Sequence, residues 1–186
     1  MEIIELKNGQ MSNNYLVINK DKALLIDCSA SVQTVKNKLG NRELVGIIIT
    51  HGHFDHFISL KEMLDCFNCK VYMHNKVAGK LGDAKLNASG YFDNLVQLDI
   101  DKNMIKFVKD EDDFNIADFN VKIYEALGHT ADSILIKIEN HIFTGDFVFE
   151  NGYGRTDLET GSFDEFKKYY RKHLKMLNEN LLHYGH

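Results

Sequence analysis

Residues 45–50, with the sequence VGIIIT, constrain the fold of this chain more than any other segment. Their apolar side chains follow one another without alternating with polar ones, which is the pattern of a strand whose sheet is covered on both faces. Apolar residues at helical spacing then predict an amphipathic helix, at Phe57, Leu60, Met63, Leu64 and Phe67. We therefore expect a sheet with helices packed on its outer side.

Further strands are predicted before and after this unit. Residues 14–28 contain two apolar runs separated by a polar turn, which predicts a hairpin. A strand at 71–73 follows the predicted helix. Four later apolar runs are spaced like the strands of a β meander, at 104–108, 120–127, 133–138 and 141–145.

The remaining segments are predicted to be loops and helices. Glycines interrupt any periodicity in residues 76–103, so we expect loop and short helix there. Ser162 and Glu165 fit a capping box and predict a last helix over 162–178. No repeat or linker divides the sequence, so residues 1–186 are expected to form a single α/β domain with mostly antiparallel strands and helices on the outside.

The composition argues against several classes of function. The chain has 22 Lys and Arg against 27 Asp and Glu, a net charge of -5, so we expect no cationic surface for nucleic acid. No basic segment followed by an apolar run opens the sequence, and no run of 18 apolar residues occurs, so neither export nor a membrane span is expected. Three cysteines do not make a disulfide framework and fit a reducing cytoplasm.

Histidine is concentrated directly after the strand at 45–50. Residues 50–56 read THGHFDH and hold three of the nine histidines. In an extended segment residues two apart point the same way, so His51 and His53 can bind one cation. Asp55 and His56 then face a neighbouring point from the start of the helix. Imidazole with carboxylate suits Zn, Fe or Mn, and the lack of nearby thiolates argues against a structural zinc site.

Similar residues follow later in the chain, at the ends of other apolar runs. His129 lies in GHT and Asp146 in TGD, and strand ends in a sandwich converge on one edge. A carboxylate has two oxygens, so Asp146 can bridge two cations in a way that a histidine cannot. His186, in YGH, adds another imidazole at the end of the sequence.

The order HxHxDH, GH, GD and GH resembles that of the metallo-β-lactamase superfamily over essentially the whole chain. The segment GRTDL at 154–158 is similar to one found in glyoxalase II-like hydrolases and in persulfide dioxygenases. The resemblance implies an αββα sandwich, in which two mostly antiparallel mixed sheets are flanked by helices and metals lie at one edge.

The resemblance also implies the ligands of two divalent metal ions, with zinc favoured over iron or manganese. The first ion would be held by His51, His53 and His129. The second would be held by Asp55, His56 and His186. Asp146 would bridge the two ions, and Asp27 matches a position that fixes a ligand from behind.

These residues predict a dinuclear metal-dependent hydrolase of small thioesters or related esters, which acts by attack of a metal-bound hydroxide. Asp55 and Asp146 would be the catalytic residues that orient the hydroxide. Tyr153 and Arg155 are candidates for binding the small-molecule substrate. Glyoxalase II proper continues into a helical domain that contacts glutathione; no such domain is expected here after residue 186, so the resemblance does not imply glutathione specificity.

Two other functions stay open. A mononuclear iron enzyme similar to the persulfide dioxygenases would use His51, His129 and Asp146 as ligands. A non-enzymatic metal-binding domain is less favoured, because no ligand of the superfamily pattern is missing. If a second metal binds His186, we expect it to order residues 181–186, because chain ends otherwise fray.

Structural roles compete with the functional ones at several residues. A salt bridge to Asp157 is the alternative role for Arg155, and packing is the alternative for Tyr153. Cys66 and Cys69 are predicted to be structural thiols. The histidines that match no ligand position are expected on the surface or in the core, at His74, His141, His173 and His183.

Overall fold

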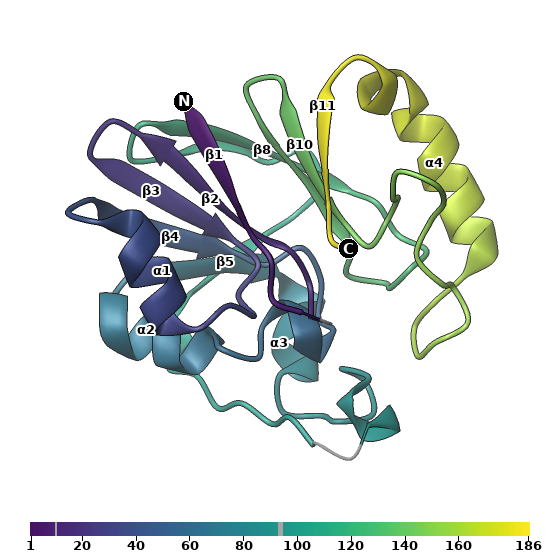
Figure 1. Cartoon of the computed structure of the whole chain (residues 1–186). Coiled ribbons are helices and arrows are strands. Elements are labelled where there is room, and N and C mark those ends of the chain that lie inside the picture. Colours follow the sequence, from purple (N-terminus) through teal and green to yellow (C-terminus); the bar gives the residue numbers. More distant parts are fainter. Residues whose placement is uncertain (10, 93–94) are drawn as a thin grey trace.

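The computed structural model describes residues 1–9, 11–92 and 95–186. Position 10 lies outside the described residues. So do positions 93–94, which fall within the segment 76–103 that was predicted to be loop and short helix. Two β-sheets face each other, and helices cover their outer sides (Figure 1). This confirms the predicted sandwich of two mixed sheets flanked by helices.

The first sheet has six strands in the order of the sequence. They are β1 (Glu2–Leu6), β2 (Asn14–Asn19), β3 (Lys22–Ile26), β4 (Glu43–Ile48), β5 (Lys70–His74) and β6 (Ile105–Val108). The pairs β1 with β2 and β2 with β3 are antiparallel, as the predicted hairpin requires, whereas β3 to β6 pair in parallel. Ile47 faces the helices and Ile48 faces the second sheet, and both are fully buried. The unbroken apolar run therefore belongs to a strand covered on both sides, as predicted.

The second sheet has five strands in the order β11-β10-β9-β8-β7. They are β7 (Asp113–Ile116), β8 (Phe119–Glu125), β9 (Ile134–Ile138), β10 (His141–Gly145) and β11 (Leu181–Tyr184). Strands β7 to β10 form an antiparallel meander, and β11 pairs in parallel with β10.

The predicted meander is wrong in its first strand. The run at 104–108 becomes β6, which pairs in parallel with β5 at the far edge of the first sheet, and the meander begins instead at β7. A run of four or five apolar residues does not encode its pairing partner, so spacing alone assigned it to the wrong sheet. Strands β1, β7 and β11 were not predicted.

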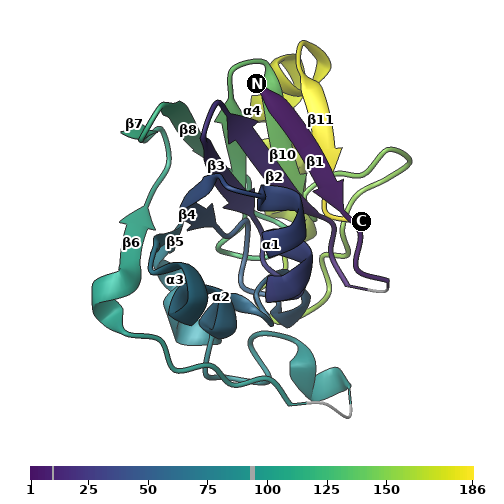
Figure 2. The same ribbon diagram turned by 60° about the vertical axis from the view of Figure 1, so that its left-hand side comes forward.

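Helices occupy the outer faces. Helices α1 (Val32–Leu39), α2 (Leu60–Phe67) and α3 (Asn75–Lys80) lie along the first sheet, and α4 (Phe163–Asn178) lies on the second (Figures 1 and 2). Short 3-10 turns complete the chain, at Phe54–His56, Ser89–Tyr91 and Lys102–Met104. The side chain of Ser162 accepts a hydrogen bond from the Glu165 amide, which confirms the predicted start of α4. Of the helices in the described part of the chain, none has the length and apolar character needed to cross a membrane.

Candidate metal centre

All seven predicted ligands meet at one edge of the sandwich, because each follows the end of a strand. The loop after β4 carries His51 and His53 and leads into the 3-10 turn Phe54–His56. His129 lies in the connection from β8 to β9, Asp146 directly follows β10, and His186 lies just beyond β11. The second half of the chain thus completes a site that the first half begins.

Three buried imidazoles face one another at this edge. The Nε2 atom of His51 lies 3.1 Å from Nδ1 of His53, and Nε2 of His129 lies 3.2 Å and 2.9 Å from these two atoms. Nδ1 of His129 donates to the carbonyl oxygen of Arg155 at 2.7 Å, so in the neutral ring its Nε2 atom carries a lone pair. That lone pair and the ring nitrogens of His51 and His53 point into one small volume, where a single cation can contact all three.

The neighbouring group consists of two carboxylates and two imidazoles. Nε2 of His186 lies 3.3 Å from Oδ2 of Asp55 and 3.5 Å from Oδ2 of Asp146. Nε2 of His56 lies 3.2 Å from Oδ1 of Asp146, yet these two buried atoms form no hydrogen bond. Oδ2 of Asp146 is also 3.6 Å from Nε2 of His129, so this carboxylate lies between the two groups.

The donor atoms fit divalent cations. The three imidazole nitrogens are 2.9 to 3.2 Å apart, close to the separation of about 3.3 Å between two nitrogens bound tetrahedrally at 2.0 to 2.1 Å from one zinc ion. Three sets of donor atoms converge closely enough to hold an ion, and they are His51 with His53 and His129, His51 with His56 and Asp146, and Asp55 with His56 and His186. The unpartnered buried atoms of His56 and Asp146 belong to these sets.

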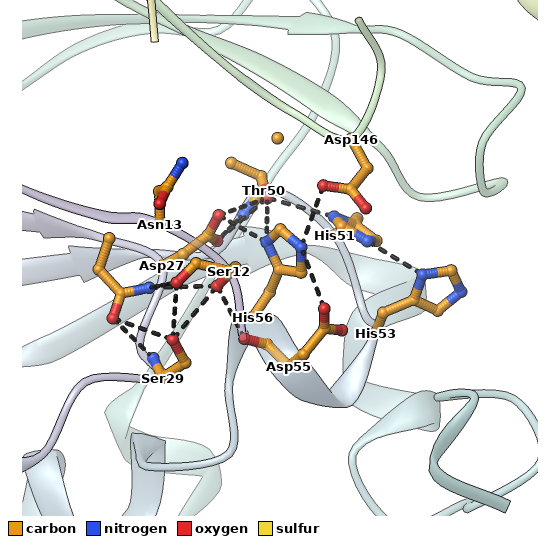
Figure 3. Close-up of polar contacts among 12 residues, drawn as sticks. Ser12, Asn13, Asp27, Ser29, Thr50, His51, His53, Asp55, His56 and Asp146 are labelled. Atoms are coloured by element: carbon orange, nitrogen blue, oxygen red, sulfur yellow. Dashed lines mark hydrogen bonds and ion pairs between the residues drawn. The ribbon is translucent and has the colours of Figure 1, made fainter. Parts of the chain in front are cut away.

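Asp27 holds His56 from behind (Figure 3). Its Oδ2 lies 2.8 Å from Nδ1 of His56, and its Oδ1 accepts from the Thr50 amide at 2.8 Å. Asp27 is 2% exposed and has a φ of 57°, a left-handed conformation that short polar residues tolerate. Because Nδ1 of His56 donates to this carboxylate, its Nε2 atom is left to face the site. Asp27 therefore contacts a candidate ligand as the resemblance implied.

Electrostatics separate the histidines into two kinds. Burial, reinforced by neighbouring imidazoles, lowers the pKa of His51 well below its usual value and that of His53 to about 3. Burial also lowers the pKa of His129. For His56, burial acts in the same direction, but Asp27, Asp146 and Asp55 outweigh it and raise the pKa. The three-imidazole group is thus neutral at neutral pH, which is the form that binds metals.

A buried ion pair supports the loop between His51 and His53, and the sequence did not reveal it. Nζ of Lys80 lies 2.5 Å from Oδ1 of Asp132, and both side chains are almost completely buried. Oδ2 of Asp132 accepts a hydrogen bond from the Gly52 amide at 2.7 Å. The position of Asp132, three residues after His129 in GHTADS, was the available signal, whereas nothing in the sequence marked Lys80.

The segment 154–158 supports the site mainly through its backbone. Gly154 passes so close to the site that a Cβ there would collide with the carbonyl oxygen of Asp146 and lie 2.8 Å from Nδ1 of His129. The Arg155 side chain lines the cavity beside the site, but it forms a two-pronged salt bridge with Asp157 at 2.8 and 3.0 Å. The structure does not bring Tyr153 to this cavity, because its ring stacks on Phe166 with centroids 4.4 Å apart.

The other histidines and cysteines lie outside these groups. Nε2 of His74 is 3.3 Å from Glu125, and that of His173 is 2.7 Å from the Glu125 carbonyl oxygen. His141 and His183 contact each other at 2.9 Å. Cys66 is exposed and Cys69 is buried in the core, and both are free thiols.

The C-terminal segment is paired through its backbone, whereas its expected ordering by a metal stays a prediction. Leu181–Tyr184 form β11, and the Gly185 amide donates to the Gly145 carbonyl oxygen at 2.9 Å. The Asn13 amide, just before β2, donates to the Gly185 carbonyl oxygen at 2.7 Å. Backbone pairing therefore holds the segment up to His186.

The chain belongs to the metallo-β-lactamase superfamily, whose sequence pattern matches residues 8–186. It is 27% identical over 175 residues to the probable metallo-hydrolase YqgX of Bacillus subtilis, covering 92% of this chain and 82% of that protein. It is also 30% identical over 182 residues to a probable metallo-hydrolase of Streptococcus pyogenes, covering 94% of this chain and 78% of the relative.

Solved structures share the fold at lower sequence identity. The BLEG-1 B3 metallo-β-lactamase superposes with a TM-score of 0.89 at 24% identity, over all of this chain and 91% of that one. TTHA1623, solved in a di-iron-bound form, superposes with a TM-score of 0.83 at 20% identity, over 98% of this chain and 91% of that one. At these identities the likeness establishes the fold alone.

Proposed function

We propose that this protein is a dinuclear metal-dependent hydrolase of small thioesters or related esters. The observation that carries the proposal is the position of Asp146, whose two oxygens lie between a group of three neutral imidazoles and a second group of imidazole and carboxylate ligands. The names of the relatives from Bacillus subtilis and Streptococcus pyogenes, both probable metallo-hydrolases, support a hydrolytic reaction.

Two divalent cations, with zinc the first choice, are assigned to the two groups. His51, His53 and His129 would hold one cation, Asp55, His56 and His186 would hold the other, and Asp146 would bridge them. When bound, such ions lower the pKa of a coordinated water to about 7 and polarise the carbonyl group of the substrate.

The residues of the chain itself position the reactants. Asp55 lines the cavity and is partly accessible, so its carboxylate can accept a hydrogen bond from the attacking water and orient it. Asp146 is more deeply buried, and the imidazoles of His56, His129 and His186 beside it lower its pKa although burial acts to raise it. It therefore stays ionised and can bridge two cations. Asp27 keeps His56 in one orientation throughout.

Replacing Asp55 tests the proposal. We expect Asp55→Ala to lower thioester hydrolysis at least a hundredfold while leaving one metal per chain, because the three-imidazole group is untouched. Metal analysis of anaerobically purified protein gives the stoichiometry. The control is Asp65→Ala, which removes an exposed carboxylate that belongs to none of the donor sets and does not line the cavity. Oxygen uptake with glutathione persulfide by the wild type, together with undiminished uptake by Asp55→Ala, would instead favour the mononuclear iron oxygenase.

A further inference from the structure

The cavity beside the candidate metal centre has a largely apolar wall. It encloses about 600 Å³, within the usual range for small-molecule sites. Its lining includes the candidate ligands His53, Asp55, His129, Asp146 and His186. Its apolar wall consists of the lining residues Met11, Phe54, Tyr91, Phe92, Phe149 and Leu158.

The apolar wall begins next to the candidate ligands. Phe54 directly precedes Asp55, and its ring centroid lies 5.3 Å from that of Phe92. The Phe149 ring, which also belongs to the apolar wall, lies 6.1 Å from the His186 ring. A group attached directly to a thioester held at the metal centre would therefore meet aromatic surface within a few bonds of the reacting carbonyl.

Two of the wall residues are unusually exposed for aromatic side chains. Tyr91 is 60% exposed and Phe92 is 59% exposed, although Phe54, whose ring lies against that of Phe92, is buried. Exposed aromatic rings at the mouth of a concave site are typical of surfaces that are covered by an apolar ligand.

The cavity lining offers little positive charge from Lys or Arg side chains for an anionic ligand. Among the described residues that line the cavity, Arg155 is the one Lys or Arg, and both prongs of its guanidinium are engaged by Asp157. Glutathione carries two carboxylates, and Arg155 could pair with one of them only in competition with Asp157. The charge distribution therefore disfavours glutathione thioesters.

We infer that the site takes a thioester that carries an uncharged, apolar group of about six carbons or an aromatic ring, in place of the charged tripeptide of glutathione. This inference rests on the proposed function for the reacting group and adds the substrate class. The apolar group can belong to the acyl side or to the thiol side, and the experiment distinguishes the two.

Hydrolysis of matched thioesters by the zinc-loaded protein is the first measurement. The acyl side is varied with the acetyl, hexanoyl and benzoyl thioesters of 2-mercaptoethanol. The thiol side is varied with the acetyl thioesters of 2-mercaptoethanol and hexanethiol. S-lactoylglutathione supplies the charged tripeptide. Each buried methylene contributes about 0.8 kcal/mol, a factor of about four. With half of the added chain in contact, the preferred apolar substrate should exceed the acetyl ester of 2-mercaptoethanol at least tenfold in kcat/KM.

A matched pair of variants locates the preference. Phe92→Ala should lower the ratio of kcat/KM between the preferred apolar substrate and the acetyl ester of 2-mercaptoethanol about fivefold. Phe107→Ala removes a ring with the same 59% exposure from β6, which does not line the cavity, and should leave the ratio within twofold of the wild type. An S-lactoylglutathione kcat/KM equal to or above that of every apolar substrate would overturn the inference.

Binding of hexanoate, acetate, hexanethiol and glutathione, measured by calorimetry, separates the substrate class from the reaction. If the apolar group is recognised, either hexanoate should bind at least tenfold tighter than acetate or hexanethiol should bind at least tenfold tighter than glutathione, and Phe92→Ala should weaken that preference. This result without hydrolysis of any thioester would refute the proposed function but support the ligand class. If hexanoate bound no tighter than acetate and hexanethiol no tighter than glutathione, the ligand class would be refuted even if thioesters are cleaved.

Discussion

The buried pair of Lys80 and Asp132 gives the most direct test of how the fold supports the metal loop. Lys80→Met keeps the length of the side chain but leaves the Asp132 carboxylate buried without its counter-charge. Breaking a buried pair by removing one partner costs about 3 to 5 kcal/mol, because the remaining charge cannot return to water. With a urea m-value of about 2 to 3 kcal/mol/M, the urea concentration at the midpoint of unfolding should fall by about 1 to 2.5 M.

The double variant separates the charge pair from simple loss of packing. Asp132→Asn retains an amide oxygen that can accept from the Gly52 amide, so the backbone hydrogen bond survives while the charge is removed. Lys80→Met combined with Asp132→Asn should therefore be more stable than the sum of the single effects predicts, by at least about 2 kcal/mol. Urea unfolding of metal-free protein, followed by circular dichroism, measures the free energy of unfolding of the wild type, the two single variants and the double variant.

The exposed pair of Lys85 and Glu159 provides the matched control. Its atoms are 3.2 Å apart, but Lys85 is largely exposed, so Lys85→Met should change the free energy of unfolding by no more than about 1 kcal/mol. The reasoning would be refuted if the changes in unfolding free energy of the Lys80 and Asp132 variants were additive. It would also be refuted if Lys80→Met lost no more stability than Lys85→Met.

Two further predictions concern histidines at the end of the chain. Removal of His186 should reduce the second metal and hydrolysis together but leave the first metal bound, and metal analysis that still finds two ions with full turnover would contradict its assignment as a ligand. Burial, with the neighbouring His141, lowers the pKa of His183 to about 4. The unfolded chain therefore gains this proton near pH 6.5 while the folded chain resists it, so stability is retained above pH 6.5 and lost as the pH falls toward 4. His183→Phe, which can keep the stacking on Phe143, should make that acid-induced loss smaller by about 2 kcal/mol after allowance for partial exposure, and identical pH profiles of urea unfolding would contradict this.

The candidate ligands could be found from the sequence because they lie at strand ends with fixed neighbours. His51 and His53 follow a strand whose unbroken apolar run already placed it inside a covered sheet. The motifs that hold His129 and Asp146 follow β8 and β10, and they were expected at the same edge of the sandwich without knowledge of the strand pairing. Even the wrong assignment of β6 to the meander left this prediction intact, because β6 carries no candidate ligand.

The residues that support the ligands were less predictable, because their roles depend on contacts between distant segments. Lys80 belongs to a helix of six residues, and its partner Asp132 is 52 positions further along the chain. The wall residue Phe92 lies in the glycine-interrupted segment for which no periodicity could be recognised. Tyr153 was chosen for its closeness to Asp146 in the sequence, yet the chain turns at Gly152 and directs its ring onto α4.

The C-terminal histidine shows how backbone pairing and ligand chemistry depend on each other. Strand β11 follows β10 in parallel, and an irregularity between Phe143 and Gly145 sets the register in which Tyr184 lies opposite Gly145. The next residue must then pass so close to Asp146 that a Cβ at Gly185 would collide with Oδ1 of that carboxylate. Glycine is therefore required by the close approach, and the same approach is what brings the following imidazole within 3.5 Å of Asp146. The pair Gly-His at the end of the sequence is thus one structural unit, in which the glycine permits the contact that the histidine uses.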